Sequence, residues 1–152
     1  ETGLCHSPII MEQVEKLADP KESAYPAGAR IGRLRQPMTA DELAAFVKEK
    51  LGAGGVRYTR REGRIQRVAV CGGAGADDFM DPAMAAGAEA LVTGEAKHHQ
   101  WLEAKERNFT LLDGSHFSTE QLVADELAAR LSAAFPDLEV CRLRESEPVR
   151  YL

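Results

Sequence analysis

The sequence predicts an α/β fold in which helices cover both faces of a mainly parallel sheet. Three observations support this prediction. Short apolar runs typical of buried strands alternate with segments of helical periodicity. Loops rich in glycine or in polar residues follow those runs. The chain, with 152 residues of which 44% are hydrophobic, is long enough to bury one substantial core.

The first 38 residues are predicted to be a connector, or the remnant of a preceding lobe, that packs on something else. Prolines and glycines interrupt this region so often that long regular elements are not expected, and only residues 11–18 have helical character. We therefore assign residues 1–38 to the connector and residues 39–152 to one C-terminal α/β lobe. Because the chain begins with Glu1 rather than methionine, we expect a fragment of a longer protein.

The lobe is expected to open with a helix and a hairpin. Thr39 and Glu42 have the spacing of a capping box, and apolar residues then recur at helical spacing until Gly52. Residues 56–60 and 64–71 follow as two predicted strands around a tight turn.

The rest of the lobe is predicted to alternate between helices and strands. The expected elements are a helix at 82–86 capped by Asp81, a strand at 90–92, a helix at 98–107, a strand at 109–112, a helix at 119–135 and a strand at 138–143. In such sheets the functional groups gather in the loops at the carboxyl ends of the strands. We expect the loops 72–78, 93–99 and 113–120 to meet at one edge.

Charge and cysteine content exclude several functional classes. The 19 Lys and Arg against 24 Asp and Glu give a net charge of −5, so nucleic acid is an unfavourable partner. Three cysteines cannot all pair within the chain, and two of them lie in strand-like runs, which indicates a reducing compartment. There is neither a signal-peptide pattern nor an apolar run near the roughly 18 residues of a membrane span. We expect a cytoplasmic protein without membrane association.

The strongest candidate for a metal site is the segment 113–120. Ser118 and Gln121 have capping-box spacing, so we expect a helix to begin just after Ser118, with His116 in the loop and Glu120 in the first turn. An imidazole and a carboxylate so placed can bind one zinc, manganese or iron ion. In the alternative interpretation, Glu120 only complements the helix dipole and His116 fills the loop.

A second candidate is the segment 93–101, which carries Glu95, His98 and His99 after a predicted strand. Glu95 is the better acid/base candidate, because a carboxylate near metal ions can take a proton from water. Adjacent histidines at a helix start point in different directions, so at most one is expected to face the site. All three residues could equally be solvated surface groups.

The segment 72–75 is a glycine-rich turn whose amides could cradle a phosphate at the next helix start. It lacks the lysine of a P-loop, and Asp78 stands where a dinucleotide motif has its third glycine. Tight packing between strand and helix is the alternative.

Three segments, 68–75, 91–99 and 112–120, resemble in order and spacing the C-terminal half of the Nif-three-like dinuclear-metal family, also known as GTP cyclohydrolase 1 type 2. The resemblance implies one lobe of a two-lobed fold, with two divalent metal ions in the cleft between the lobes. His116 and Glu120 correspond to two of the ligands. Ser115 departs from the usual glycine, and Phe117 from a frequent tyrosine or histidine.

The family's other ligands belong to an N-terminal lobe that has no convincing counterpart here, so the chain is expected to hold half of a dinuclear site. The resemblance also implies a homohexamer and a small-molecule, nucleotide-like substrate. Three hypotheses stay open. The chain is part of a metal-dependent hydrolase, a ring-forming metal-binding scaffold without turnover, or a nucleotide-binding domain that uses residues 72–75.

Overall fold

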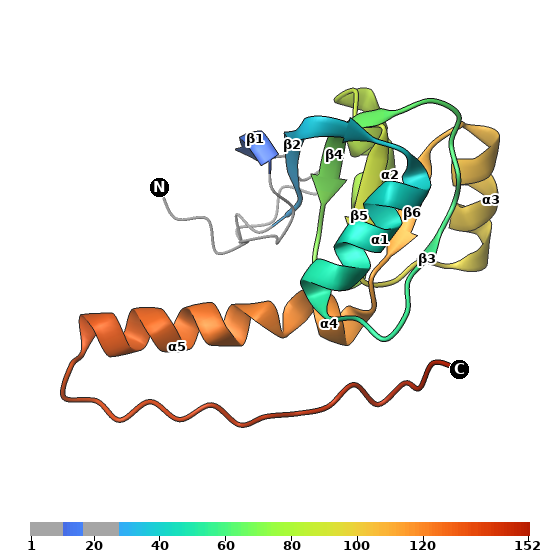
Figure 1. The fold of residues 1–152 in the computed structure, drawn as a ribbon. Coiled ribbons are helices and arrows are strands. Elements are labelled where there is room, and N and C mark those ends of the chain that lie inside the picture. Colours follow the sequence, from blue (N-terminus) through green and yellow to red (C-terminus); the bar gives the residue numbers. More distant parts are fainter. Residues whose placement is uncertain (1–10, 17–27) are drawn as a thin grey trace.

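The computed structural model describes residues 11–16, as backbone, and residues 28–152 (Figure 1). Its helices and strands follow in this order: β1 (Met11–Lys16), β2 (Arg30–Met38), α1 (Ala40–Leu51), β3 (Arg57–Tyr58), β4 (Ile65–Val70), α2 (Ala76–Ala85), β5 (Ala90–Thr93), α3 (His98–Glu106), β6 (Thr110–Asp113), α4 (His116–Glu120) and α5 (Leu122–Ala134).

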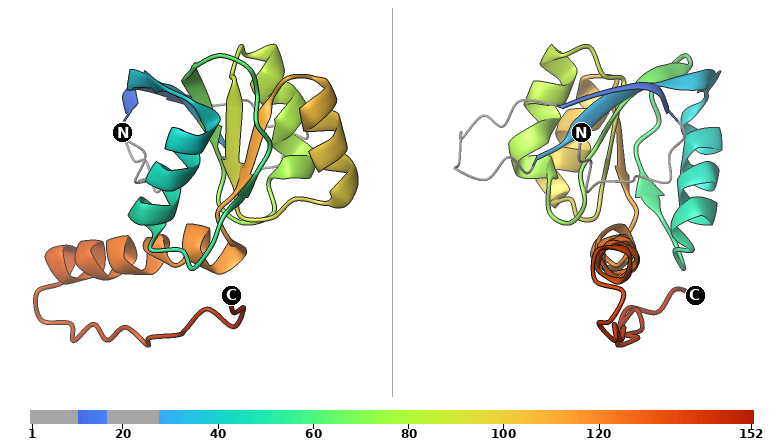
Figure 2. Two further views of the ribbon diagram at one scale, coloured as in Figure 1. Left: turned by 45° about the vertical axis from the view of Figure 1, so that its right-hand side comes forward. Right: turned by 90° about the vertical axis from the view of Figure 1, so that its left-hand side faces the viewer.

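The strands form one mixed sheet whose centre is parallel. The order is β1-β2-β4-β5-β6-β3, with β4, β5 and β6 parallel and the other three strands antiparallel to their neighbours. Helix α1 covers one face, and α2 and α3 cover the other (Figure 2). The predicted α/β class is confirmed, with helices on both faces of the sheet and parallel pairing at its centre.

Alternation along the central strands sends side chains into two separate cores. Val68 and Val70 of β4 face the core beneath α1, whereas Ala69 between them faces the core beneath α2 and α3. Strand β6 does the same with Leu112 and Leu111, both fully buried. Burial on both faces explains why these strands read as continuous apolar runs.

Helix α1 begins and ends where the sequence predicts. The Thr39 hydroxyl accepts from the Glu42 N–H at 3.2 Å, and the Glu42 carboxylate accepts from the Thr39 N–H at 2.7 Å. Gly52 ends the helix at φ 61°, a left-handed conformation that glycine adopts at little cost. The capping-box prediction is confirmed.

The predicted hairpin is wrong. Strand β4 pairs with β2 on one side and β5 on the other, so β3 has no place beside it. Instead β3 pairs with β6 at the far edge of the sheet, with Arg57 opposite Asp113 and Tyr58 opposite Leu112. The turn residues 60–64 therefore cross the end of the sheet instead of closing a two-strand loop.

The region assigned to a connector contributes two strands. The helix expected at 11–18 is wrong, because residues 11–16 form β1; the rest of that expected helix lies outside the described residues. Residues 30–38 form β2, whose pairing with β4 places it in the sheet of the lobe. Backbone pairing at the sheet edge outweighs the proline and glycine content of this region.

Two later elements also differ from the prediction. Helix α2 begins six residues early, at Ala76, with Gly75 as its N-cap and Pro82 inside it. Asp77 and Asp78 in the first turn complement the helix dipole and favour this earlier start. No strand forms at 138–143, since the chain after α5 runs back along that helix, away from both edges of the sheet (Figure 1).

Candidate functional site

The loops that follow β4, β5 and β6 meet at the carboxyl edge of the parallel strands, as the topology predicts. The Gly94 N–H donates to the Gly73 carbonyl at 2.8 Å, and the Gly114 N–H donates to the Thr93 carbonyl at 2.8 Å. The Thr93 hydroxyl, fully buried, donates to the Gly73 carbonyl at 2.9 Å. A Cβ at residue 94 would stand only 2.8 Å from the Cα of His116, so the close approach requires glycine there.

His116 lies between two carboxylates at this edge. Its Nδ1 is 3.2 Å from Oε2 of Glu95, and its Nε2 is 3.3 Å from Oε2 of Glu120. All three side chains are about half exposed, at 49% for the histidine and 56% for each glutamate. The cluster joins the segments 93–99 and 113–120, which the sequence identified separately.

Helix α4 starts earlier than predicted and therefore carries both candidate ligands. Ser115, not Ser118, is the N-cap, and its hydroxyl accepts from the Ser118 N–H at 3.4 Å. His116 is thus the first helical residue rather than a loop residue, and Glu120 is the last residue of α4. Residues four apart lie on one helix face, which brings the two side chains together.

Ser115 adopts a conformation that is rare for residues other than glycine. Its φ is 75° and its ψ 135°, a strained region that persists only when neighbouring contacts fix it. The Ser115 N–H donates to Oδ1 of Asp113 at 2.9 Å, and its carbonyl accepts from the Thr119 N–H at 3.1 Å. The turn places His116 shortly after the end of β6, as the first residue of α4.

Thr119 ties the glycine-rich loop to α4, a role that sequence reasoning missed. Its hydroxyl accepts from the Gly73 N–H at 3.1 Å and donates to the Ser115 carbonyl at 2.9 Å. A Cβ at Gly73 would lie 2.3 Å from Oε1 of Glu120. The sequence signal for this role is a hydroxyl residue directly before a candidate ligand, in a chain that also has a glycine-rich turn after a strand.

His98 and His99 are exposed in the first turn of α3 and make no hydrogen bond or ion pair with any described residue. Their neighbours point elsewhere, because Lys97 and Gln100 both contact Asp77, at 2.5 Å and 2.8 Å. The hydrogen bond to Asp77 raises the pKa of the Lys97 ammonium. Of the three catalytic candidates, only Glu95 is brought against His116.

Two described side chains lie close enough to bind one metal ion together. These are His116, through Nε2, and Glu120, through its carboxylate. Asp113 is not available as a third, because its carboxylate accepts from Arg57 at 2.5 Å and from the Ser115 N–H. Within residues 11–16 and 28–152, no set of three or more His, Cys, Asp and Glu side chains could hold a metal ion. The described chain therefore offers a partial donor set.

Amides of the glycine-rich loop make hydrogen bonds within the chain. The Gly73 N–H donates to Thr119, and the Gly75 N–H donates to the buried Thr93 hydroxyl at 3.0 Å. Asp77 and Asp78 begin the helix that follows, so this helix start repels anions. These contacts favour the packing interpretation over a phosphate cradle.

Comparison with known proteins identifies the family. The profile of the DUF34/NIF3 family (NGG1p interacting factor 3) matches residues 8–148. The chain belongs to this family. Two relatives are each described as a GTP cyclohydrolase 1 type 2 homolog. The one from Staphylococcus epidermidis is 44% identical over 99 residues, which is 64% of this chain and 26% of the relative. The one from Allochromatium vinosum is 31% identical over 105 residues, 69% of this chain and 41% of the relative.

Solved structures share the DUF34/NIF3 fold. The crystal structure of Staphylococcus aureus hypothetical protein SA1388 superposes with a TM-score of 0.74 at 28% identity, over 82% of this chain and 43% of that one. A Bacillus cereus protein related to NIF3 gives a TM-score of 0.71 at 24% identity, over 83% of this chain and 36% of that one, and shows the fold alone. The chain spans less than half the length of these relatives.

Among the described helices, none is long and apolar enough to cross a membrane.

Proposed function

We propose that this chain is the metal-binding half of a metal-dependent hydrolase of the DUF34/NIF3 family, and that His116 and Glu120 hold one side of a two-metal site. The observation that carries the proposal is the pair of contacts on the His116 ring, with Glu120 at Nε2 and Glu95 at Nδ1. The names of the curated relatives support a hydrolase that acts on a nucleotide-like small molecule.

The ring contacts fit a metal ligand. A neutral imidazole binds a metal through one nitrogen while the other carries a proton. The Glu95 carboxylate accepts a hydrogen bond at Nδ1, which leaves the lone pair of Nε2 on the side of Glu120. One nitrogen and one oxygen donor suit zinc, manganese or iron. The remaining ligands would come from another lobe or another polypeptide.

When bound, the metal pair would supply Lewis-acid activation of water and substrate. Glu95 holds the Nδ1 proton of His116 through Oε2, and its Oε1 has no hydrogen-bond partner among the described residues. We assign to this second oxygen the role of proton acceptor for the reacting group, which makes Glu95 the proposed general base. His98 and His99 stay predictions for substrate contact.

A ring-forming scaffold without turnover is the second candidate. Helix α5 has no buried residue, and Val123, Leu127 and Leu131 form an exposed apolar stripe at a spacing of four residues. Such a stripe is typical of a helix that packs on a partner, which supports self-association, the expected hexamer included. The scaffold predicts assembly and metal content without hydrolysis.

We also propose a reducing, cytoplasmic location. The three cysteines of the sequence cannot all pair within the chain, and Cys141 is a free thiol in the described part. Free thiols persist where glutathione and thioredoxin keep them reduced.

The test is the metal content of the purified chain after incubation with zinc, manganese or iron and removal of excess ion. Wild type should retain metal that both His116→Ala and Glu120→Ala lose. His99→Ala and Glu106→Ala are matched controls, because both residues are exposed and make no ion pair with a described residue. Metal retained by His116→Ala, or absent from wild type, would overturn the proposal. Hydrolysis assays with the metal-loaded protein then separate the enzyme from the scaffold.

A further inference from the structure

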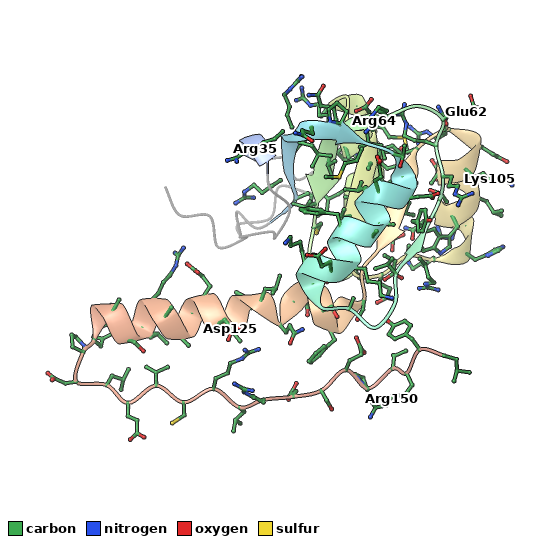
Figure 3. All side chains as sticks on the ribbon, viewed as in Figure 1. Arg35, Glu62, Arg64, Lys105, Asp125 and Arg150 are labelled. Carbon is green, nitrogen blue, oxygen red and sulfur yellow. The ribbon has the colours of Figure 1, made fainter. Side chains whose placement is uncertain are left out.

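The segment after α5, residues 136–152, runs back beneath that helix and ends near α4 without forming a helix or strand (Figure 1). Three of its side chains make specific contacts with the rest of the chain. Figure 3 labels Asp125 on α5 and Arg150 near the end of the chain. Arg142 pairs with Asp125 and also donates to the Gln121 carbonyl at 3.5 Å.

The second contact is between the ring of Tyr151 and two consecutive glycines, Gly54 and Gly55. A Cβ at Gly54 would lie 2.5 Å from Cδ2 of Tyr151, and a Cβ at Gly55 would lie 2.5 Å from its Cδ1. The ring therefore lies against both glycines, at a distance that only glycine allows. This contact fixes the end of the segment to the loop between α1 and β3.

The third contact reaches the candidate site. The Ser115 hydroxyl donates to Oε2 of Glu147, and Oε1 of Glu147 accepts from the Val149 N–H at 3.2 Å. Among the described residues, Glu147 is the only hydrogen-bond partner of Ser115 that lies outside residues 113–119. The carboxylate therefore joins the C-terminal segment to the residue directly before His116.

This contact matters because Ser115 has a strained backbone. A residue other than glycine at φ 75° keeps its conformation only when its surroundings over-determine it. Local bonds to Asp113 and Thr119 fix its backbone groups, whereas Glu147 and the Ser118 N–H hold its hydroxyl. Loss of Glu147 would leave the Ser115 hydroxyl, which caps α4 directly before His116, held only by the Ser118 N–H at 3.4 Å.

We propose that residues 136–152 act as a strap that holds α4 in place, and that Ser115 and Glu147 are positioning residues for His116. The proposal rests on the proposed function where it concerns metal affinity, but not where it concerns the order of α4. Displacement of the strap leaves both candidate ligands present and lowers the affinity of the pair.

The experiment uses the full 152-residue chain and two readouts. The first is amide hydrogen exchange of residues 114–120 without metal, and the second is titration with cobalt(II), followed by its ligand-field absorption. Glu147→Ala and Tyr151→Ala should speed exchange on the order of tenfold, because local opening becomes easier. Both should also weaken cobalt binding about tenfold, at the lower end of the effect of outer-sphere partners of a ligating histidine.

Two conservative variants and one charge-removing variant are the controls. Glu147→Gln keeps an oxygen acceptor for Ser115, and Tyr151→Phe keeps the ring, so both should behave like wild type. Glu145→Ala removes an equal charge from the same segment at an exposed residue and should change neither readout.

The outcomes separate this proposal from the proposed function. Unchanged exchange at 114–120 in Glu147→Ala would overturn the strap, and faster exchange with unchanged cobalt affinity would overturn the positioning role. If wild type binds no cobalt, the proposed function fails, while the exchange readout still decides whether the strap exists.

Discussion

Gly73 lies directly against Glu120. A Cβ at residue 73 would stand 2.3 Å from Oε1 of that glutamate and 3.2 Å from Nε2 of His116. The loop after β4 thus forms the floor beneath both candidate ligands, and its backbone leaves no room for a side chain. This relationship joins the loop after β4 to the helix after β6 and gives the first prediction.

Gly73→Ala should weaken metal binding by at least tenfold, because the new methyl group displaces Glu120. Gly52→Ala is the matched control, since its φ of 61° is close to the 65° of Gly73 and a Cβ there meets nothing within 4 Å. Both variants should lose about 1–3 kcal/mol of stability from backbone strain. Urea unfolding and cobalt(II) titration measure the two effects, and equal metal affinity in the two variants would contradict the steric account.

Thr119→Val should destabilise the lobe by about 1–3 kcal/mol, because it leaves the Gly73 N–H without an acceptor. Thr119→Ser keeps the hydroxyl and should stay close to wild type. The free energies of unfolding from urea titrations test this pair. A valine variant as stable as the serine variant would mean that the hydroxyl does not tie the loop to α4.

Lowering the pH should remove the contribution of the α1 capping box to the stability of the fold. The Thr39 N–H holds the pKa of Glu42 below its ordinary value of 4.5. A lowered folded-state pKa adds stability that is fully present above 4.5 and is lost as the pH falls through the lowered value. Glu42→Gln keeps the shape and an acceptor but does not titrate. Its urea midpoint should lie slightly below that of wild type at pH 7, and the gap should close below pH 4.5. A gap that stays constant to pH 3 would contradict this assignment.

Local sequence signals predicted the elements that local contacts determine. The capping box at Thr39 and the left-handed Gly52 involve only residues of the same turn, so the bounds of α1 follow from them. The apolar runs of β4, β5 and β6 reflect burial on both faces, which gives the parallel centre of the sheet. The hydrophobic content predicted one substantial core, and the net charge made nucleic acid an unfavourable partner.

Elements whose form depends on distant partners were not predictable in this way. Tyr58 looks like part of a hairpin, yet its partner is Leu112, more than 50 residues later. Residues 11–16 became a strand only because β2 offers an edge. Proline at 82 indicates a helix start locally, whereas Asp77 and Asp78 together with Gly75 start α2 earlier.

The candidate site shows the same division. The motif 113–120 identified His116 and Glu120 as a pair, and β-strand topology explained why Glu95 comes near them. The early start of α4 was missed because Ser115 adopts a positive φ, which its residue type does not indicate. Glu147 was missed because its contact with Ser115 spans 32 residues and carries no spacing signal.

In the proposed site, Nε2 of His116 binds metal while its Nδ1 keeps a proton on the side of Glu95. A long-range ¹H–¹⁵N spectrum of the histidine side chains during zinc titration tests it most directly, with His116→Ala to assign the signals. Zinc should shift Nε2 of His116 and leave Nδ1 protonated, while His98 and His99 stay unchanged. Shifts confined to His98 or His99, or zinc bound at Nδ1 of His116, would mean that Nε2 of His116 is not the metal ligand.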